Sequence, residues 1–371
     1  MAYGRPLVLG AAAALLALAA AGCGGDDEGD SAPPPSPLAT GPIDPGEESM
    51  TPGPSAPPPA TGDDAPAPLR VVDVSDAGSL QSALDAAQAG DEIRMADGTY
   101  VGQFRLTPSG TADTPITLSG TRNAVIDGEG IKKGRTVELT GSFWRLTGFT
   151  VTNGQKGVMA LGTQGTVIDG LLVHTIGDEA IHLRDGSSDN IVRNCEVHDT
   201  GLRRPGFGEA VYIGQAVSNW VDEQPDRSDR NKILNNRLGP NIAAEHVDIK
   251  EGTTGGEVRG NVFDGRGQTG ENSGESWVNA KGNDWVIEDN TGTGAYASGF
   301  KTRVQLEGWG CGNVFRGNKG TVEPVSGPEP GWAFDIHSKN RGCESNPNIV
   351  YADNAVKGPR GQDSNIPKRA R

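Results

Sequence analysis

A four-residue motif, called the phrase below, occurs four times with a basic residue at its fourth position. Each copy alternates apolar and polar residues and ends on Lys, Arg or His. A stack of like charges repels itself unless an anion binds there, and a lysine beside another lysine has a depressed pKa, which makes it a usable base. The pattern suggests proton transfer on an anionic ligand, although a solvated face with satisfied charges has the same composition. The copies are Val247-Asp248-Ile249-Lys250, Val278-Asn279-Ala280-Lys281, Phe300-Lys301-Thr302-Arg303 and Phe334-Asp335-Ile336-His337.

Alternation at period two makes each copy a strand whose second and fourth residues face outward. Two outward columns result, with neighbours about 5 Å apart because paired strands have that spacing. The first column is His182, Tyr212, Asp248, Asn279, Lys301 and Asp335, and the second is Arg184, Gly214, Lys250, Lys281, Arg303 and His337. We expect substrate contacts from His182, Arg184, Tyr212, Asn279 and His337. Trp220 and an outward Trp277 could stack on sugars or simply cover strand backbone.

The strand phrase recurs every 21 to 36 residues, which is typical of a coil that adds one rung per repeat. Second strands end in asparagines that we expect to form a ladder of side-chain amides. The helical pattern of residues 79–89 predicts a cap over the first rung. The sequence thus predicts an all-β, single-stranded, right-handed parallel β-helix with an N-terminal capping helix. The expected ladder is Asn194, Asn236, Asn261, Asn290, Asn318 and Asn354.

The first 69 residues are unlike the coil. Residues 1–22 have the order of a signal peptide, and Cys23 follows them as in a bacterial lipobox, which predicts lipid anchoring on the outer face of a membrane; plain secretion is the alternative. Residues 23–69 hold 13 prolines and nine acids without Lys or Arg, so we expect a disordered stalk. The β-helix is expected over 70–357 and a flexible basic tail over 358–371.

Net charge limits the possible binding partners, and the cysteines indicate a disulfide. The formal net charge of −15 argues against nucleic acid and permits cation binding. In an exported protein, Cys311 and Cys343 lie in turn-like sequence before matching strands of consecutive rungs, and we expect a disulfide between them. Cys195 is predicted to be a buried thiol. We expect a monomer.

Several stretches resemble the β-helical polysaccharide lyases that include chondroitinase B and alginate lyases. In that family a lysine is the proposed base, a glutamate five residues before it helps to bind calcium, and an arginine on the next rung assists. The resemblance puts Lys250, Glu245 and Lys281 at these positions, while Ala243 replaces a second glutamate. The stretches are GEAVYIGQA (208–216), ILNNRL (233–238), EHVDIKEG (245–252), VRGNVF (258–263) and WVNAKGN (277–283).

The resemblance implies β-elimination at a uronic acid. Lys250 would be the base, Lys281 and Arg303 would neutralise the carboxylate, and Glu245 with Asp248 would hold calcium or orient the lysines. Tyr212 or His182 would protonate the leaving oxygen. Two other functions stay open: a glycoside hydrolase that uses Asp248 with Asp335 or Glu209, and a surface adhesin that binds glycan without converting it. The sequence does not name the polymer.

Overall fold

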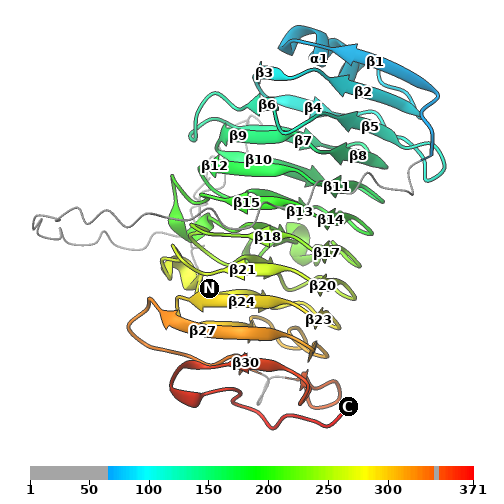
Figure 1. The fold of residues 1–371 in the computed structure, drawn as a ribbon. Coiled ribbons are helices and arrows are strands. Elements are labelled where there is room, and N and C mark those ends of the chain that lie inside the picture. The colour runs from blue at the N-terminus through cyan, green and yellow to red at the C-terminus, as the bar shows by residue number, and fades with distance from the viewer. Residues whose placement is uncertain (1–65, 338–341) are drawn as a thin grey trace, which may run out of the picture. The chain divides into compact units, whose positions relative to one another are not determined.

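The computed structural model describes residues 66–337 and 342–371 of the chain. Their strands wind into a coil with three parallel sheets, and most turns of the coil contribute one strand to each sheet (Figure 1). This is the predicted parallel β-helix. Among the described residues, no helix has the length and apolar character needed to cross a membrane.

We name the three sheets A, B and C. Sheet A consists of β1 (Arg70–Val74), β2 (Asp91–Met95), β5 (Ile116–Ser119), β8 (Trp144–Thr147), β11 (Val167–Asp169), β14 (Ile191–Arg193), β17 (Lys232–Leu234), β20 (Glu257–Arg259), β23 (Val286–Glu288), β26 (Val314–Arg316) and β29 (Ile349–Val350). Sheet B consists of β3 (Gly98–Val101), β6 (Ala124–Asp127), β9 (Thr150–Gly154), β12 (Leu172–Ile176), β15 (Glu196–His198), β18 (Arg237–Leu238), β21 (Val262–Asp264), β24 (Thr291–Ala295), β27 (Lys319–Val325) and β30 (Ala355–Lys357).

Sheet C carries the repeated phrase of the sequence. It consists of β4 (Phe104–Leu106), β7 (Arg135–Leu139), β10 (Lys156–Leu161), β13 (Ile181–Arg184), β16 (Val211–Ile213), β19 (Val247–Ile249), β22 (Ser276–Ala280), β25 (Ser298–Thr302) and β28 (Phe334–Ile336). The register pairs Tyr212 with Asp248, Asp248 with Asn279, and Asn279 with Lys301, so the first outward column is confirmed.

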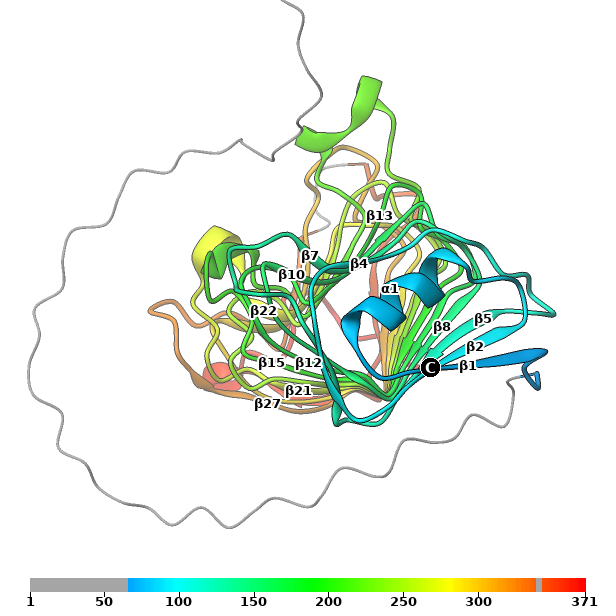
Figure 2. The same ribbon diagram turned by 90° about the horizontal axis from the view of Figure 1, so that it is seen from above.

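A helix closes the N-terminal end of the coil, as predicted. Helix α1 (Ala77–Asp85) begins at Asp76, whose side chain accepts a hydrogen bond from the backbone N–H of Ser79 while the Ser79 side chain accepts one from Asp76. Leu80 and Leu84 of α1 are fully buried over the first turn. Figure 2, which looks down the coil, shows α1 lying across its open end.

The asparagine ladder is confirmed for five of its six predicted members. Each amide donates to the next side-chain oxygen at 2.9 or 3.0 Å, from Asn236 to Asn354. Asn194 was wrongly assigned: it lies at φ +54° and donates to Asp169, and Cys195 occupies the ladder position, where its N–H donates to Asn236 at 2.9 Å. A second row, which the sequence analysis missed, joins Asn190 to Asn231 at 3.1 Å.

The C-terminal residues are not the flexible tail that the sequence predicted. Residues 359–361 form the short helix η5 (Pro359–Gly361), and Ser364 and Arg369 bridge to Phe334 and Tyr351. The last residues therefore cover the final rungs. The disulfide between Cys311 and Cys343 is confirmed, and Cys195 is a buried free thiol, also as predicted.

Candidate active site

The outward face of sheet C gathers the predicted reactive side chains around one buried carboxylate. Asp248 is 1% exposed and contacts the ammonium groups of two lysines, one on its own strand and one on the next. Its Oδ2 lies 2.8 Å from Lys250 Nζ, and its Oδ1 accepts from Lys281 Nζ. Strand alternation puts residues 248 and 250 on one face, and the parallel register brings Lys281 beside Lys250.

The pKa values of the two lysines shift in opposite directions. Burial acts to lower the pKa of Lys250, but Asp248, followed by Tyr212 and Glu209, outweighs burial and holds that pKa well above its usual value. Burial lowers the pKa of Lys281, and the neighbouring charge of Lys250 adds to the lowering against the pull of Asp248. The expected depression of one lysine pKa is thus found at Lys281.

Tyr212 lies on the preceding strand beside this pair. Its ring centroid is 4.8 Å from Lys250 Nζ and 4.1 Å from the His182 ring. Burial raises the pKa of the Tyr212 phenol, so the hydroxyl keeps its proton at neutral pH. The phenol of Tyr212 can therefore act as an acid and the amine of Lys250 as a base, both within reach of one sugar.

Three buried glutamates lie at matching positions, each two residues before the phrase on β13, β16 and β19. Lys156 Nζ lies 3.1 Å from Glu179, and Asn279 donates to Glu245 at 2.8 Å. The Oε2 of Glu209 has no hydrogen-bond partner among the described residues. Burial, with Glu179 and Glu245 adding to it, raises the pKa of Glu209 well above its usual value. The sequence analysis missed Glu179, although Glu-Ala before the strand at 179 and 209 was a visible signal.

Hard-cation ligands are present in the same cluster. Glu209, Glu245 and Asp248 can each place one carboxylate oxygen within 4.8 Å of the others. Calcium prefers carboxylate oxygens, and the unpartnered oxygen of Glu209 is a buried acceptor of the required kind. The donor set therefore fits the calcium that the family resemblance implied, with Glu209 added to the predicted ligands.

Two projections flank this face. On one side, η2 (Val217–Asn219) and η3 (Val221–Glu223) rise as the green projection at the top of Figure 2. Trp220 there packs edge-on against Trp309 with ring centroids 6.5 Å apart. On the other side, η1 (Pro205–Phe207) meets η4 (Glu271–Ser273), where Asn272 donates to the Gly206 carbonyl at 3.1 Å. The Val217 N–H donates to Glu251 at 2.7 Å, so the loop that contains Trp220 lies beside the end of β19.

Three residues predicted to contact substrate have buried side chains that contact other parts of the protein. His182 is 3% exposed and directs Nε2 to the Gly214 carbonyl at 2.9 Å, so it supports Tyr212 from behind. Asn279 is fully buried and holds Glu245. Trp277 is also fully buried, with its ring stacked on Phe263.

Farther along the same face, the other predicted cations are spread out. Lys301 contacts Glu275 at 2.5 Å, and Arg184 donates to Gln215. Arg303 and His337 line an open cavity of about 650 Å³. The structure therefore brings Lys250, Lys281 and Tyr212 together and places Arg303 in a separate hollow.

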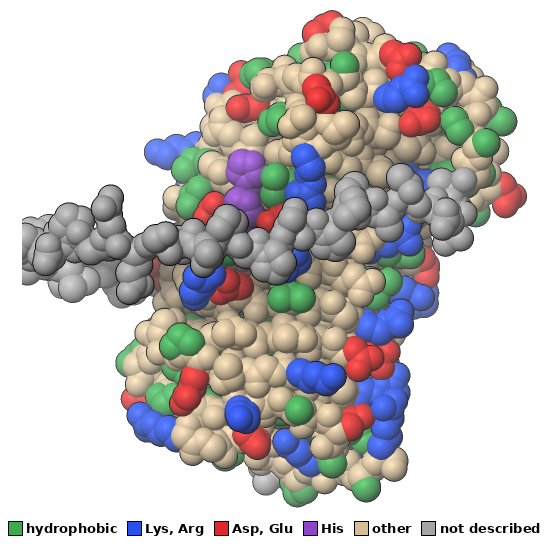
Figure 3. Space-filling view, viewed as in Figure 1, with side chains coloured by type: hydrophobic (Ala, Val, Ile, Leu, Met, Phe, Trp, Pro, Cys, Tyr) green, Lys and Arg blue, Asp and Glu red, His purple; other side chains and the backbone are tan. Residues whose placement is uncertain are grey.

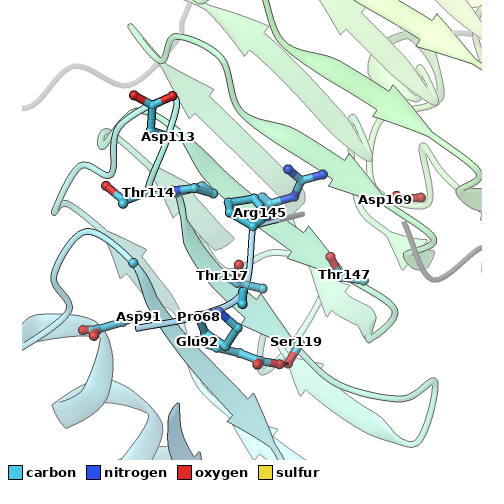
Figure 4. A pocket seen from close by; sticks show the side chains of 14 residues that line it. Pro68, Asp91, Glu92, Asp113, Thr114, Thr117, Ser119, Arg145, Thr147 and Asp169 are labelled. Carbon is cyan, nitrogen blue, oxygen red and sulfur yellow. Dashed lines mark hydrogen bonds between the residues drawn. The ribbon is translucent and has the colours of Figure 1, made fainter. Parts of the chain in front are cut away.

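Among the described residues, no carboxylate on the other two faces is shared by two lysines as Asp248 is on sheet C. On the visible part of the sheet B face, acidic and basic side chains are intermixed (Figure 3). On sheet A, Arg145 and Thr117 line a hollow of about 180 Å³ (Figure 4). Two of the acids around it are paired, since Arg70 donates to Asp91 at 2.9 Å and Arg193 donates to Asp169 at 2.8 Å. We therefore assign the chemistry to sheet C.

Comparison with known proteins agrees with this fold. The family model for the Pel9A-like right-handed β-helix region matches residues 72–211, which fixes the handedness of the coil. The crystal structure of the pectate lyase Pel9A is 15% identical over 78% of this chain and 81% of its own, with a TM-score of 0.57. A rhamnogalacturonan lyase is 14% identical over 78% and 81%, with a TM-score of 0.58. A search of the curated proteins gives no significant match.

One solved structure is much more similar. An alginate lyase from Paenibacillus sp. str. FPU-7 is 37% identical over 80% of this chain and 99% of its own, with a TM-score of 0.70. The fold and the lysine–tyrosine cluster define a pectin lyase-like polysaccharide lyase. Within that class, the chain belongs to the family of the Paenibacillus enzyme. Of the three functions that the sequence left open, this similarity supports the lyase.

Proposed function

We propose that the protein cleaves a uronate polysaccharide, alginate in particular, by β-elimination. The observation that carries the proposal is the buried Asp248 with Lys250 and Lys281 beside Tyr212 on the outward face of sheet C. The similarity to an alginate lyase supports alginate as the polymer. A cationic pair suits an anionic sugar because removal of a proton next to a carboxylate creates a second negative charge that must be stabilised.

Each proton and bond of the reaction can be assigned to a side chain. Lys250, once it has given its own proton to solvent, takes the C5 proton of the uronate, and the electron pair that remains forms the C4–C5 double bond. The C4–oxygen bond breaks, and the Tyr212 phenol gives its proton to the leaving oxygen. Lys281 stabilises the charge on the substrate carboxylate. Asp248 keeps both amines in place, since both contact its oxygens.

Calcium belongs to the same proposal. Glu209, Glu245 and Asp248 would hold the ion, which would supply a fixed positive charge beside the substrate carboxylate. Added calcium should raise the melting temperature of the wild-type protein, and chelation should reverse the effect. Glu209→Gln should lose this response. If the melting temperature of the wild-type protein changed with neither calcium nor chelator, the proposed calcium site would be wrong.

The cellular setting rests on residues outside the described ones. The signal-like segment 1–22, Cys23 and the proline-rich segment that follows support an enzyme anchored by lipid at the outer cell surface. Growth with a labelled fatty acid should label the wild-type protein and leave Cys23→Ala unlabelled and released. An unlabelled, freely secreted wild-type protein would favour simple export.

The substrate is tested with a panel of polymers. Alginate, pectate, chondroitin and a neutral glycan are each incubated with the full chain, and ultraviolet absorbance of the unsaturated product is followed. We expect product from alginate and none from the neutral glycan. Product from pectate or chondroitin alone would keep the elimination but overturn the choice of polymer.

A further inference from the structure

Arg303 differs from the other cations of its column. Lys250 and Lys281 both contact Asp248, and Arg184 donates to Asp185 and Gln215. The guanidinium of Arg303 makes no hydrogen bond or ion pair with any residue in 66–337 or 342–371, while its backbone N–H donates to the Ala280 carbonyl at 3.2 Å. A half-buried arginine without a carboxylate partner is available to an outside anion.

The cavity that Arg303 lines has further polar groups. Asn365 and His337 lie in the same lining. The neighbouring carboxylate of Asp335 is already engaged, because it accepts from Asn365 Nδ2 at 3.0 Å and lies 3.1 Å from His337 Nε2. Asp335 therefore does not pair with Arg303, and the charge of Arg303 is left for a ligand.

The backbone that holds Arg303 is fixed on both sides. Strand β25 ends directly before it, and the next residue, Val304, is 4% exposed and packs with the Cys311–Cys343 disulfide. A binding group on a rigid element loses little entropy when it engages a ligand. Arg303 is thus preorganised for binding.

From these observations, we propose that Arg303 and its cavity form a distal subsite, which binds the carboxylate of a second uronate in the same polysaccharide chain. The inference rests on the proposed function, because it needs an acidic polymer on sheet C. Arg303 lies two strands beyond Lys250, a span of about 10 Å at the usual strand spacing. Substrate would therefore extend along the coil axis from Tyr212 toward β28, and Arg303 would not touch the reacting sugar.

The test is the dependence of binding on ligand length. Alginate oligomers from disaccharide to hexasaccharide are titrated into the full chain with Tyr212→Phe, which keeps the ligand intact, with and without Arg303→Gln. Affinity should rise by about tenfold to a hundredfold at the length that reaches the cavity, since a charge-assisted hydrogen bond has that strength. Arg303→Gln should abolish this rise, while the matched control Arg237→Gln on the exposed face of sheet B should keep it.

Other outcomes would overturn the subsite. An equal loss of affinity at every length would place Arg303 at the reacting sugar, and an unchanged length dependence would mean that it binds no substrate. A failure of the proposed function is recognised separately, because it appears as missing product in the wild type. Length-dependent binding through Arg303 would then still stand.

Discussion

Asp248 gives the candidate site its particular chemistry because one carboxylate serves two amines. Against the effect of burial, Asp248, with Tyr212 and Glu209, raises the pKa of Lys250, whereas burial and the charge of Lys250 lower that of Lys281. The sequence predicted both lysines and the acid from strand parity alone. It could not predict this split of the two pKa values, which depends on distances and burial.

The split leads to a pH prediction. If neutral Lys250 is the base, turnover of alginate should keep rising into the alkaline range, because the raised pKa keeps the amine protonated at neutral pH. Asp248→Asn removes the charge that raises this pKa, so the rise should move to lower pH. Lys281→Met removes a positive charge beside Lys250, which then has Asp248 to itself. The rise in rate should therefore move to higher pH.

Initial rates over a pH series for the three proteins check this prediction. A wild-type rate that levels off below the ordinary lysine pKa would point to Lys281 as the base. A rate that falls as the solution becomes alkaline would mean that Lys250 acts as an acid. Either result contradicts the assigned roles.

Glu209 gives a stability prediction. Its raised pKa means that the native protein keeps a proton which the unfolded chain releases above the ordinary carboxyl pKa. The free energy of unfolding must therefore fall as pH rises from that value toward the native pKa. In the presence of chelator, Glu209→Gln should match the wild type in acid and become the more stable protein as pH rises.

Melting temperatures over a pH series measure this effect. Glu271→Gln, which changes an exposed acid of η4, should differ from the wild type by the same small amount at each pH. A Glu209→Gln protein that loses stability relative to the wild type as pH rises would reverse the sign and show that Glu209 is ionised in the native state.

Among the elements, the asparagine ladder shows what a repeat can and cannot predict. Its spacing predicted the stack from Asn236 to Asn354, because one position recurs on every rung. It failed at Asn194, where the strand is offset by one residue and Cys195 takes the inward place. Strand parity did not show that Asn279 and His182 are buried, since neighbouring side chains can still cover an outward position. It placed Trp277 outward, whereas this ring lies in the hydrophobic core against Phe263 and Phe300.

The ladder should be a large local source of stability. Asn290 donates to the Val258 carbonyl at 2.9 Å and to Asn318 at 3.0 Å, and accepts from Asn261. Asn290→Ala leaves buried groups unpaired and should lower the free energy of unfolding by about 3 kcal/mol. Chemical denaturation measures the change. Asn219→Ala, at an exposed position of η2, should lower the free energy of unfolding by less than about 0.5 kcal/mol. Equal losses for the two variants would show that the ladder does not stabilise the fold.

Cys195 offers the reverse experiment. Its thiol lies 3.7 Å from the Ile168 carbonyl, at the place where Asn236 donates to the Val192 carbonyl one rung later. Cys195→Asn should extend the ladder by one member and raise stability by about 1 kcal/mol. The wild-type thiol should resist modification, because burial raises its pKa to about 12. The denaturation midpoints of the wild type and Cys195→Asn test this prediction. A less stable variant would show that the rung has no room for the amide.

For the whole molecule, the sequence was sufficient for the architecture because every rung repeats the same alternation and the coil follows from pairing successive copies. It was insufficient at the ends and at the surface. The residues from Pro359 to Arg369 pack on the last rungs, although their composition resembles a solvated tail. The walls around sheet C and the cavity at Arg303 come from insertions of unequal length, whose course no repeat specifies.

The central claim is that Lys250 takes the proton in an elimination on alginate. The decisive measurement is the rate of ultraviolet-absorbing product formation from alginate by the wild type and by Lys250→Ala, with Lys357→Ala on exposed β30 as the matched control. We predict that Lys250→Ala slows the reaction by about a thousandfold at unchanged fold and that the control is fully active. A folded Lys250→Ala protein with wild-type rates would contradict the account.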